Sequence, residues 1–395
     1  MKEKFLRELA DIQTGPFGSQ LHKEDYVADG TPIVTVEHLG NKMFSEQNLP
    51  RVSNTDKNRL KKYVLKQGDI VFSRVGSVDR CSYVDQKHDG WMFSGRCLRV
   101  RPTSEIDSEY LYYYFCLEET KQFVRNIAVG ATMPSINTKL LGEVVVTFPE
   151  LEQQKRISGI LSAIDSKIEV NQKINDNLEQ QAATYFQELF INNANPMWQI
   201  STISDLGTVV GGSTPSKTKP EYYTNNGIAW ITPKDLSINK SKFISHGEND
   251  ITELGLKNSS ATVMPKDTVL FSSRAPIGYI AIASNEVTTN QGFKSVIPYS
   301  EIGTAFVYFF LKHSLPVIES AASGSTFKEI SGSAMKNIPA IIPDRNTLDQ
   351  FNSFCAPIFA QQKILEEQNH SLAMLRDSLL PKLMSSAIDI ASIQL

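Results

Sequence analysis

The chain has 395 residues, of which 41% are hydrophobic, so it holds enough apolar material for two or three folded domains. Its formal net charge of −3 excludes a protein that binds DNA through overall positive charge alone. No apolar run approaches the ~20 residues of a membrane span, and the N-terminus lacks the apolar core of a signal peptide. We therefore expect a cytoplasmic protein with no membrane partner.

The first globular segment, residues 1–149, is a mixture of strand-like and helical patterns. Strand-like runs occupy residues 32–39 and 68–74, with glycines at the turns beside them. A helical stretch rich in aromatic residues follows at 108–127. We interpret these aromatic side chains as core rather than as a platform for stacking bases, because no arginines are interleaved among them.

Residues 150–195 differ in composition from the segment before them, and this composition predicts one long helix. Between residues 150 and 192 there is no proline and one glycine, and acid follows the proline at 149. Apolar and small polar residues recur at alternating steps of three and four, which is the pattern of a coiled-coil seam. The seam residues that we select here are Ile157, Leu161, Ile164, Ile168, Asn175 and Leu178.

Residues 196–343 repeat the mixed pattern, with strand-like runs at 229–236 and 267–274 and a helical stretch at 303–322. Residues 344–395 then repeat the long helix. Adding 194 to the first seam gives a second, less apolar one, and we expect Pro357 to kink or restart this helix. The second seam contains Phe351, Ile358, Leu365, Asn369 and Leu372.

The constant offset of 194 residues indicates an internal duplication. It relates residues 9–19 to 203–213, residues 129–137 to 323–331, and residues 144–150 to 338–344. A duplicated chain is expected to form two similar bodies related by a pseudo-twofold axis, and this favours antiparallel pairing of the two long helices. DNA is a target with matching local symmetry.

Asn175 and Asn369 occupy equivalent positions in the two seams. Either these side chains face solvent at the flank of the helices, or they form a buried polar pair that fixes the register. The heptad pattern leaves both readings open.

Enzyme motifs are missing from the sequence. It has no nucleotide-binding glycine loop, no zinc-protease or hydrolase motif, and no cofactor or catalytic motif of an adenine methyltransferase. The four cysteines and six histidines show no metal-ligand spacing, so we expect reduced thiols and no metal site. These absences favour a non-catalytic binding or scaffolding protein.

Taken together, the chain resembles the specificity (S) subunit of prokaryotic type I restriction–modification enzymes. The motifs that carry the resemblance are residues 9–26, 203–236, 269–284 and 288–296, and the helical segment 149–179. The resemblance implies an α+β fold in which two similar mixed α/β target recognition domains are separated by two long helices. The domains would be residues 1–149 and 196–343, and the helices 150–195 and 344–395, pairing as an antiparallel coiled coil.

The resemblance also implies a division of labour within a larger complex. The S subunit would read double-stranded DNA without doing chemistry, each domain recognising one half of a gapped bipartite site. Two methyltransferase (M) subunits, docked mainly on the helices, would bring S-adenosylmethionine and methylate adenine. Restriction (R) subunits, where present, would use ATP and magnesium to translocate and cut DNA.

Polar residues on loops held by strands are our candidates for DNA contacts, because donors and acceptors at groove edges discriminate bases. Arg274 stands out as the sole arginine of its domain, and Thr326 and Lys328 are candidates for phosphate contacts. The base-reading candidates of the first domain are Ser19, Gln20, His22, Lys23, Arg74, Ser77, Arg80 and Arg96. Those of the second domain are Ser213, Thr214, Ser216, Lys217, Lys219, Lys234, Arg274, Asn290 and Gln291.

Two other functions remain open from the residues alone. The acidic helices and near-neutral globular segments are compatible with a duplicated coiled-coil adaptor that binds protein partners without reading DNA. An enzyme with an unrecognised site is the third possibility, and the missing motifs disfavour it. A map of adenine methylation in a host with and without the gene would separate these functions.

Overall fold

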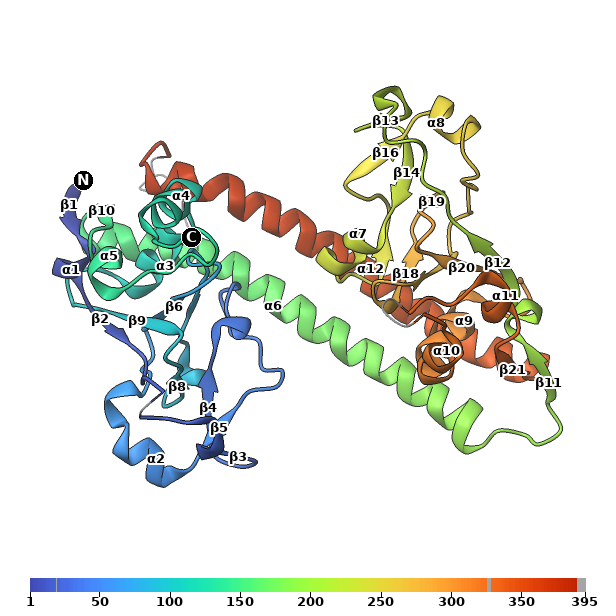
Figure 1. Cartoon of the computed structure of the whole chain (residues 1–395), viewed down its shortest axis with the longest axis horizontal. Coiled ribbons are helices and arrows are strands. Elements are labelled where there is room, and N and C mark those ends of the chain that lie inside the picture. The colour runs from blue at the N-terminus through green and yellow to red at the C-terminus, as the bar shows by residue number, and fades with distance from the viewer. Residues whose placement is uncertain (19, 325–327, 389–395) are drawn as a thin grey trace. The chain divides into compact units, whose positions relative to one another are not determined.

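The computed structural model describes residues 1–18, 20–324 and 328–388, apart from the side chain of Lys23. The chain divides into two compact units (Figure 1). Unit 1 consists of Met1–Glu169 and the segment from Ser371 onward, and unit 2 is Val170–His370. Each unit therefore contains one globular segment and a part of both long helices, while the division into four segments stays a prediction.

Unit 1 is a mixed α/β structure built on a four-stranded antiparallel sheet of order β2-β9-β6-β7. A smaller sheet of order β3-β5-β4-β8 and a two-stranded ribbon of β1 and β10 complete it. The strands are β1 Lys2–Phe5, β2 Ala10–Thr14, β3 Tyr26–Val27, β4 Thr31–Val34, β5 Arg51–Val52, β6 Ile70–Ser73, β7 Cys81–Tyr83, β8 Met92–Phe93, β9 Cys97–Pro102 and β10 Val145–Phe148. The helices are α1 Leu6–Leu9, α2 Asn54–Arg59, α3 Ser108–Cys116, α4 Glu118–Ile127 and α5 Thr138–Gly142.

Unit 2 repeats this topology and adds one strand, β15, which pairs parallel with β18 at the edge of the main sheet. Its main sheet has the order β12-β20-β17-β18-β15, its smaller sheet β13-β16-β14-β19, and its ribbon pairs β11 with β21. The strands are β11 Gln199–Thr202, β12 Gly207–Gly211, β13 Tyr223–Thr224, β14 Ile228–Ile231, β15 Phe243–Ile244, β16 Asn249–Ile251, β17 Val269–Ser273, β18 Ile277–Ala283, β19 Thr288–Thr289, β20 Lys294–Pro298 and β21 Pro339–Ile342. The helices are α7 Pro233–Ile238, α8 Glu253–Lys257, α9 Thr304–His313, α10 Leu315–Ala321 and α11 Gly332–Lys336.

The central strand of each main sheet is buried on both faces. In β6, Ile70 and Phe72 point into the core formed with the helices, while Val71 joins the core under the smaller sheet. In β17, Phe271 and Leu270 divide between the two cores in the same way. Because side chains alternate along a strand, burial on both faces requires an unbroken apolar run, and both strands have one.

Both long helices are continuous, α6 from Leu151 to Gln187 and α12 from Arg345 to Met384. A π-helical turn, Glu188–Asn192, extends α6. The expectation that Pro357 restarts the second helix is wrong. The carbonyl group four residues before Pro357 belongs to Ser353, and both residues are exposed, so solvent can satisfy the oxygen that proline leaves without a donor.

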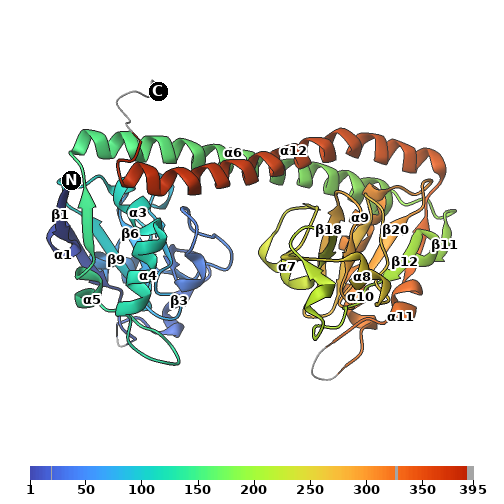
Figure 2. The same cartoon turned by 90° about the horizontal axis from the view of Figure 1, so that it is seen from above.

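Within each unit the two helices pair antiparallel (Figure 2). In unit 1, Ile157 and Leu161 of α6 share a core with Leu380 and Leu383 of α12. In unit 2, the end of α6 from Ala182 shares a core with the beginning of α12. The core residues of these two helix ends include Phe186, Phe190, Phe351, Cys355 and Ile358. The seam residues selected from the sequence are all buried or half-buried.

A polar pair does occur within the helix pair of unit 2, but its members are the buried Asn171 and the half-buried Asn369. The Asn171 side-chain amide donates to Oδ1 of Asn369 over 2.9 Å. Asn175 is buried too, and its backbone carbonyl accepts a hydrogen bond of 3.1 Å from Gln362. Asn175 therefore lies inside the helix pair rather than at a solvent-facing flank.

The strand-like runs 32–39 and 229–236 are strands only in their first halves. After β4 the chain turns into a 3₁₀ helix at Val36–His38, and after β14 it enters α7. Among the described residues, no helix combines the length and apolar character needed to cross a bilayer.

Candidate nucleic-acid interface

Each unit carries a cleft of mixed polar and apolar lining beside the smaller sheet. In unit 1 the cavity is about 530 Å³ and in unit 2 about 660 Å³; we name them cleft 1 and cleft 2. Equivalent segments line both, namely the loop after the first main-sheet strand, the turn after β4 or β14, the residue after β6 or β17, and the loop before β9 or β20. Cleft 1 is lined by Pro16, Phe17, Gly18, Leu21, Tyr26, Thr35, Val36, Glu37, Arg74, Ser94, Gly95 and Arg96.

The turn after β4 or β14, which lines each cleft, has the same hydrogen-bonding pattern in both units. In unit 1, Thr35 caps the turn, and its backbone N–H lies 3.0 Å from Nδ1 of His38. In unit 2, Thr232 caps the turn, and its N–H donates to Oδ2 of Asp235 over 2.7 Å. Both are capping boxes, in which the residue three positions after the cap reaches back to it. The two residues between cap and partner are left to face the cleft.

An arginine directly follows the central strand in each unit. Arg74 donates from Nη1 to the Gly95 carbonyl over 3.1 Å, and its guanidinium lies 5.8 Å from the centre of the Phe17 ring. Arg274 donates from Nη1 to Oε2 of Glu329 over 3.3 Å. Each contact uses only some of the five N–H groups of the guanidinium, so other N–H groups remain for a further ligand.

In unit 1 the structure brings two of the predicted DNA-contact residues, Arg74 and Arg96, into the cleft. Gln20 is engaged elsewhere, since its Oε1 accepts a hydrogen bond of 2.7 Å from Tyr63. His22, Ser77 and Arg80 are exposed outside the cleft lining, and Arg80 donates to the Leu39 carbonyl. Ser19 and the side chain of Lys23 lie outside what the structure describes.

In unit 2 the structure gathers most of the predicted residues. Cleft 2 is lined by Thr214, Lys217, Lys234, Arg274, Asn290 and Gln291. Five of these are engaged with neighbours: Thr214 donates to Gln291, Lys234 to Glu248 over 2.6 Å and Arg274 to Glu329. Asn290 accepts a hydrogen bond of 2.8 Å from the Gly292 N–H. Ser213, Ser216 and Lys219 lie on the same loop beside the cleft, Lys328 is exposed, and Thr326 falls outside the described residues.

Several lining residues were missed from the sequence. Phe17, with 55% of its surface exposed, and Glu37 belong to cleft 1, and Trp230 and Asn249 belong to cleft 2. The duplication itself contains a signal for Glu37. The capping turns align residues 35–38 with residues 232–235, so Glu37 occupies the position that is equivalent to Lys234.

A lysine anchors each globular part to the long helices of its own unit. The Lys42 backbone carbonyl accepts from Tyr83 N–H, and its Nζ donates to Glu109 over 2.8 Å and to Ser162 of α6 over 3.0 Å. In unit 2 the equivalent Lys242 carbonyl accepts from Ile282 N–H. We call these two residues the anchor lysines.

The anchor lysine of unit 2 sits in the more buried cluster. Its Nζ donates to Gln362 of α12 over 2.6 Å and pairs with Glu179 of α6, which also pairs with Lys312 at 2.5 Å. Burial lowers the pKa of Lys242 despite its acidic partner. Burial also opposes ionisation of Glu179, but the charges of the two lysines outweigh it and hold the pKa of Glu179 below its ordinary value.

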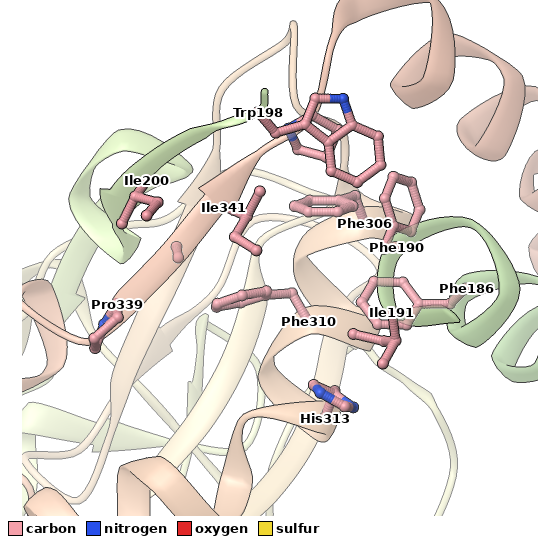
Figure 3. Close-up of a pocket in the computed structure, with 12 residues that line it drawn as sticks. Phe186, Phe190, Ile191, Trp198, Ile200, Phe306, Phe310, His313, Pro339 and Ile341 are labelled. Atoms are coloured by element: carbon pink, nitrogen blue, oxygen red, sulfur yellow. The ribbon is translucent and has the colours of Figure 1, made fainter. Parts of the chain in front are cut away.

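A third cavity, of about 350 Å³, has a different character. It lies in unit 2 where the end of α6 meets α9 and the β11–β21 ribbon, and Figure 3 shows Phe186, Phe190, Phe306 and Phe310 around it. His313 is the one ionisable side chain that lines it. An apolar lining of this kind offers too few donors and acceptors to read base edges.

Within the described ranges, no three His, Cys, Asp or Glu side chains are grouped to hold a metal ion. The geometry defines a class of protein: a duplicated protein with one cleft in each of two topologically similar units, and both long helices packed into the cores of those units.

Residues 1–180 and 195–369 match the family model of the type I restriction modification DNA specificity domain, and the chain belongs to this family. It is 43% identical over 162 residues to the type I restriction enzyme MjaIX specificity subunit of Methanocaldococcus jannaschii, covering 40% of this chain and 37% of that relative. It is 24% identical over 406 residues to the HindI specificity subunit of Haemophilus influenzae, covering 83% of this chain and 88% of that one.

The fold is likewise that of a solved structure. The crystal structure of the type I restriction-modification S subunit from M. genitalium matches with a TM-score of 0.60 at 17% sequence identity. The match covers 97% of this chain and 95% of that chain. The predicted fold class, with two similar domains and two long helices, is confirmed.

Proposed function

We propose that this chain is the DNA-recognition subunit of a type I restriction–modification enzyme, in which each unit reads one half of a gapped bipartite site. The observation that carries the proposal is the pair of clefts. They are built on the same strands and the same capping turn, yet lined by different side chains. A shared backbone arrangement that presents different side chains in the two clefts suits two half-sites of different sequence.

The linings have the chemistry that base reading requires. Arginine donates in a bidentate manner to guanine, and asparagine and glutamine pair with adenine, at about 1–3 kcal/mol of discrimination for each good pair. Cleft 1 offers Arg74 and Arg96, while cleft 2 offers Arg274, Asn290 and Gln291. We propose these five residues as the first group to test among the predicted DNA contacts.

The helices are the proposed docking sites for two M subunits. In unit 2, Val170, Ile174 and Ile364 expose between 40% and 49% of their surface, and in unit 1 Met374 and Leu375 expose 55% and 47%. Large apolar side chains on the outer faces of polar helices favour a protein partner over solvent. S-adenosylmethionine would then be bound by the M subunits, and ATP and magnesium by R subunits where present, with no catalysis by this chain.

A methylome tests the proposal. The chain would be expressed in the cytoplasm of a prokaryotic host with the methyltransferase genes beside its own, and adenine methylation mapped with and without it. We expect one gapped bipartite motif that depends on this chain. Methylation without a motif, or an unchanged map, would contradict the proposal and revive the adaptor without DNA readout, which the match to a DNA specificity family disfavours.

We also propose that the helices set the length of the gap. An insertion of four residues after Gln172, inside α6, adds about 6 Å of helix, or roughly two base-pair steps. The mapped gap should lengthen while both half-sequences stay the same. A matched insertion after Ser104, in an exposed loop of unit 1, should leave the gap unchanged. An unaltered gap in the first variant would remove the helices from this role.

A further inference from the structure

The two capping turns place residues of opposite charge at one equivalent position. Glu37 is the second residue after the cap Thr35, and Lys234 is the second residue after the cap Thr232. Both side chains are exposed, and both line their cleft. The backbone frame is therefore shared, while the charge that it presents is reversed.

Glu37 differs from the other acidic residues of the clefts in having no structural task in the described part of the chain. Asp235 closes a capping box, and Glu248 pairs with Lys234. The one side-chain partner of Glu37 there is Thr35, whose hydroxyl donates to Oε1 over 3.1 Å. Glu37 forms no ion pair with the described residues, although Arg74 and Arg96 line the same cleft.

A carboxylate in such a place is unfavourable beside DNA phosphates, because like charges repel and an ionised group loses its water on binding. It becomes favourable when it accepts a hydrogen bond from a base. In the major groove the exocyclic amino groups, N4 of cytosine and N6 of adenine, are the available donors, and acidic side chains accept from cytosine N4. The flanking arginines would hold the acidic oxygen away from the phosphates by taking those contacts themselves.

We propose that Glu37 is a specificity-determining residue of unit 1 that accepts a hydrogen bond from the exocyclic amino group of one base in its half-site. This inference rests on the proposed function and goes further, because it names a residue, an atom and the chemical group that is read. Loss of the carboxylate should relax recognition at one base pair and leave the other half-site unchanged.

The first experiment maps methylation by the whole complex carrying Glu37→Ala, with Glu119→Ala as the matched control. Glu119 is an exposed acid of α4 that does not line the cleft. In the alanine variant, the preference at one position of one half-site should fall roughly 5- to 150-fold. The control should keep the wild-type motif. If Glu37→Ala yields no methylation at all, Glu37→Met, which keeps the length of the side chain but has no oxygen acceptor, decides by the same measurement.

The second experiment removes the amino group from the DNA. Duplexes carrying the mapped motif would have the base at the relaxed position replaced by 2-pyrimidinone for cytosine or by purine for adenine. Wild-type complex should bind the altered duplex more weakly, whereas the Glu37→Ala complex should bind both duplexes equally. If Glu37 had only a structural role, the Glu37→Ala complex would bind both duplexes more weakly than wild type by the same factor.

The outcomes separate the inference from the function beneath it. A wild-type complex with a gapped motif, combined with a Glu37→Ala variant of unchanged preference at every position, overturns the inference and leaves the proposed function standing. A change confined to the other half-site also overturns it. A wild-type complex without any gapped motif overturns both.

Discussion

Units 1 and 2 are two versions of one topology, and they differ most where a ligand would touch them. Strand orders, the β-ribbon and the capping turn recur, with Thr35 and His38 in one unit matched by Thr232 and Asp235 in the other. The cleft linings share little beyond the arginine after the central strand. The comparison teaches that hydrogen bonds within the backbone frame fix the position of the cleft, and that its chemistry is free to vary.

The anchor lysines show a second difference. The Lys242 side chain is 6% exposed and meets partners on both long helices, while Lys42 is 14% exposed and reaches one helix, at Ser162. Unit 2 therefore depends on a buried charge cluster at the place where unit 1 uses a more solvated one.

Exchange of residues 1–149 for the matching segment of a relative should have the largest effect, because a whole lining changes. We expect one half-site of the methylation motif to be replaced and the other to remain. A change in both half-sites would break the comparison, since it would mean that the units do not read independently.

The comparison of the two units can be tested by the free energy of unfolding that each anchor lysine contributes. Lys242→Met leaves Glu179 with one lysine and Gln362 without its donor, so it should lower the free energy of unfolding by about 3 kcal/mol. Lys42→Met should cost about 1 kcal/mol because its surroundings are wetter. Hydrogen exchange at β17 and β6 would report on each unit. Lys363→Ala, which removes the half-buried lysine that pairs with the exposed Glu367 on α12, provides the control. Equal losses would contradict the difference.

Asn171 and Asn175 of unit 2 both bury a side-chain oxygen that has no hydrogen-bond partner among the described residues, but the Asn171 amide also donates to Asn369. The Asn175 side-chain oxygen is buried without a hydrogen-bond partner among the described residues, so Asn175→Leu should raise the free energy of unfolding by about 1 kcal/mol. Asn171→Leu should lower it by a similar amount, since it removes the donor to Asn369. Chemical denaturation measures both, and two changes of the same sign would refute the distinction.

The smallest expected effect is a dependence on pH in the cluster around Lys242. Because the pKa of Glu179 is lowered by folding, its contribution to stability is present above about pH 4.5 and is lost as the pH falls through the folded value. The advantage of wild type over Glu179→Gln should shrink in acid. Burial raises the pKa of Glu366, so the advantage of wild type over Glu366→Gln should grow as the pH falls through that raised value and level off below about pH 4.5. Melting temperatures at several pH values would check both signs.

Much of the fold could be predicted from the sequence, because its main features leave periodic or repeated patterns. The 194-residue offset predicts two equivalent units, and the heptad seams predict the long helices. The pairing of polar seam residues could not be predicted, since the period does not say that Asn369 meets Asn171 rather than Asn175.

The site was predicted less well, for a physical reason. The runs 32–39 and 229–236 look like strands because valine, isoleucine and threonine favour extended backbone, yet capping boxes turn each chain halfway along. Reading them as strands hid Glu37. Loop residues such as Arg96, Asn290 and Gln291 were found, because polar side chains between strong strands are easily recognised.

The capping turn has a consequence beyond a single complex. Its hydrogen bonds involve the threonine and the residue three places later, whereas the cleft-facing position between them holds glutamate in one unit and lysine in the other. A single codon change at this position can thus alter the chemistry of a cleft while both ends of its capping box are retained.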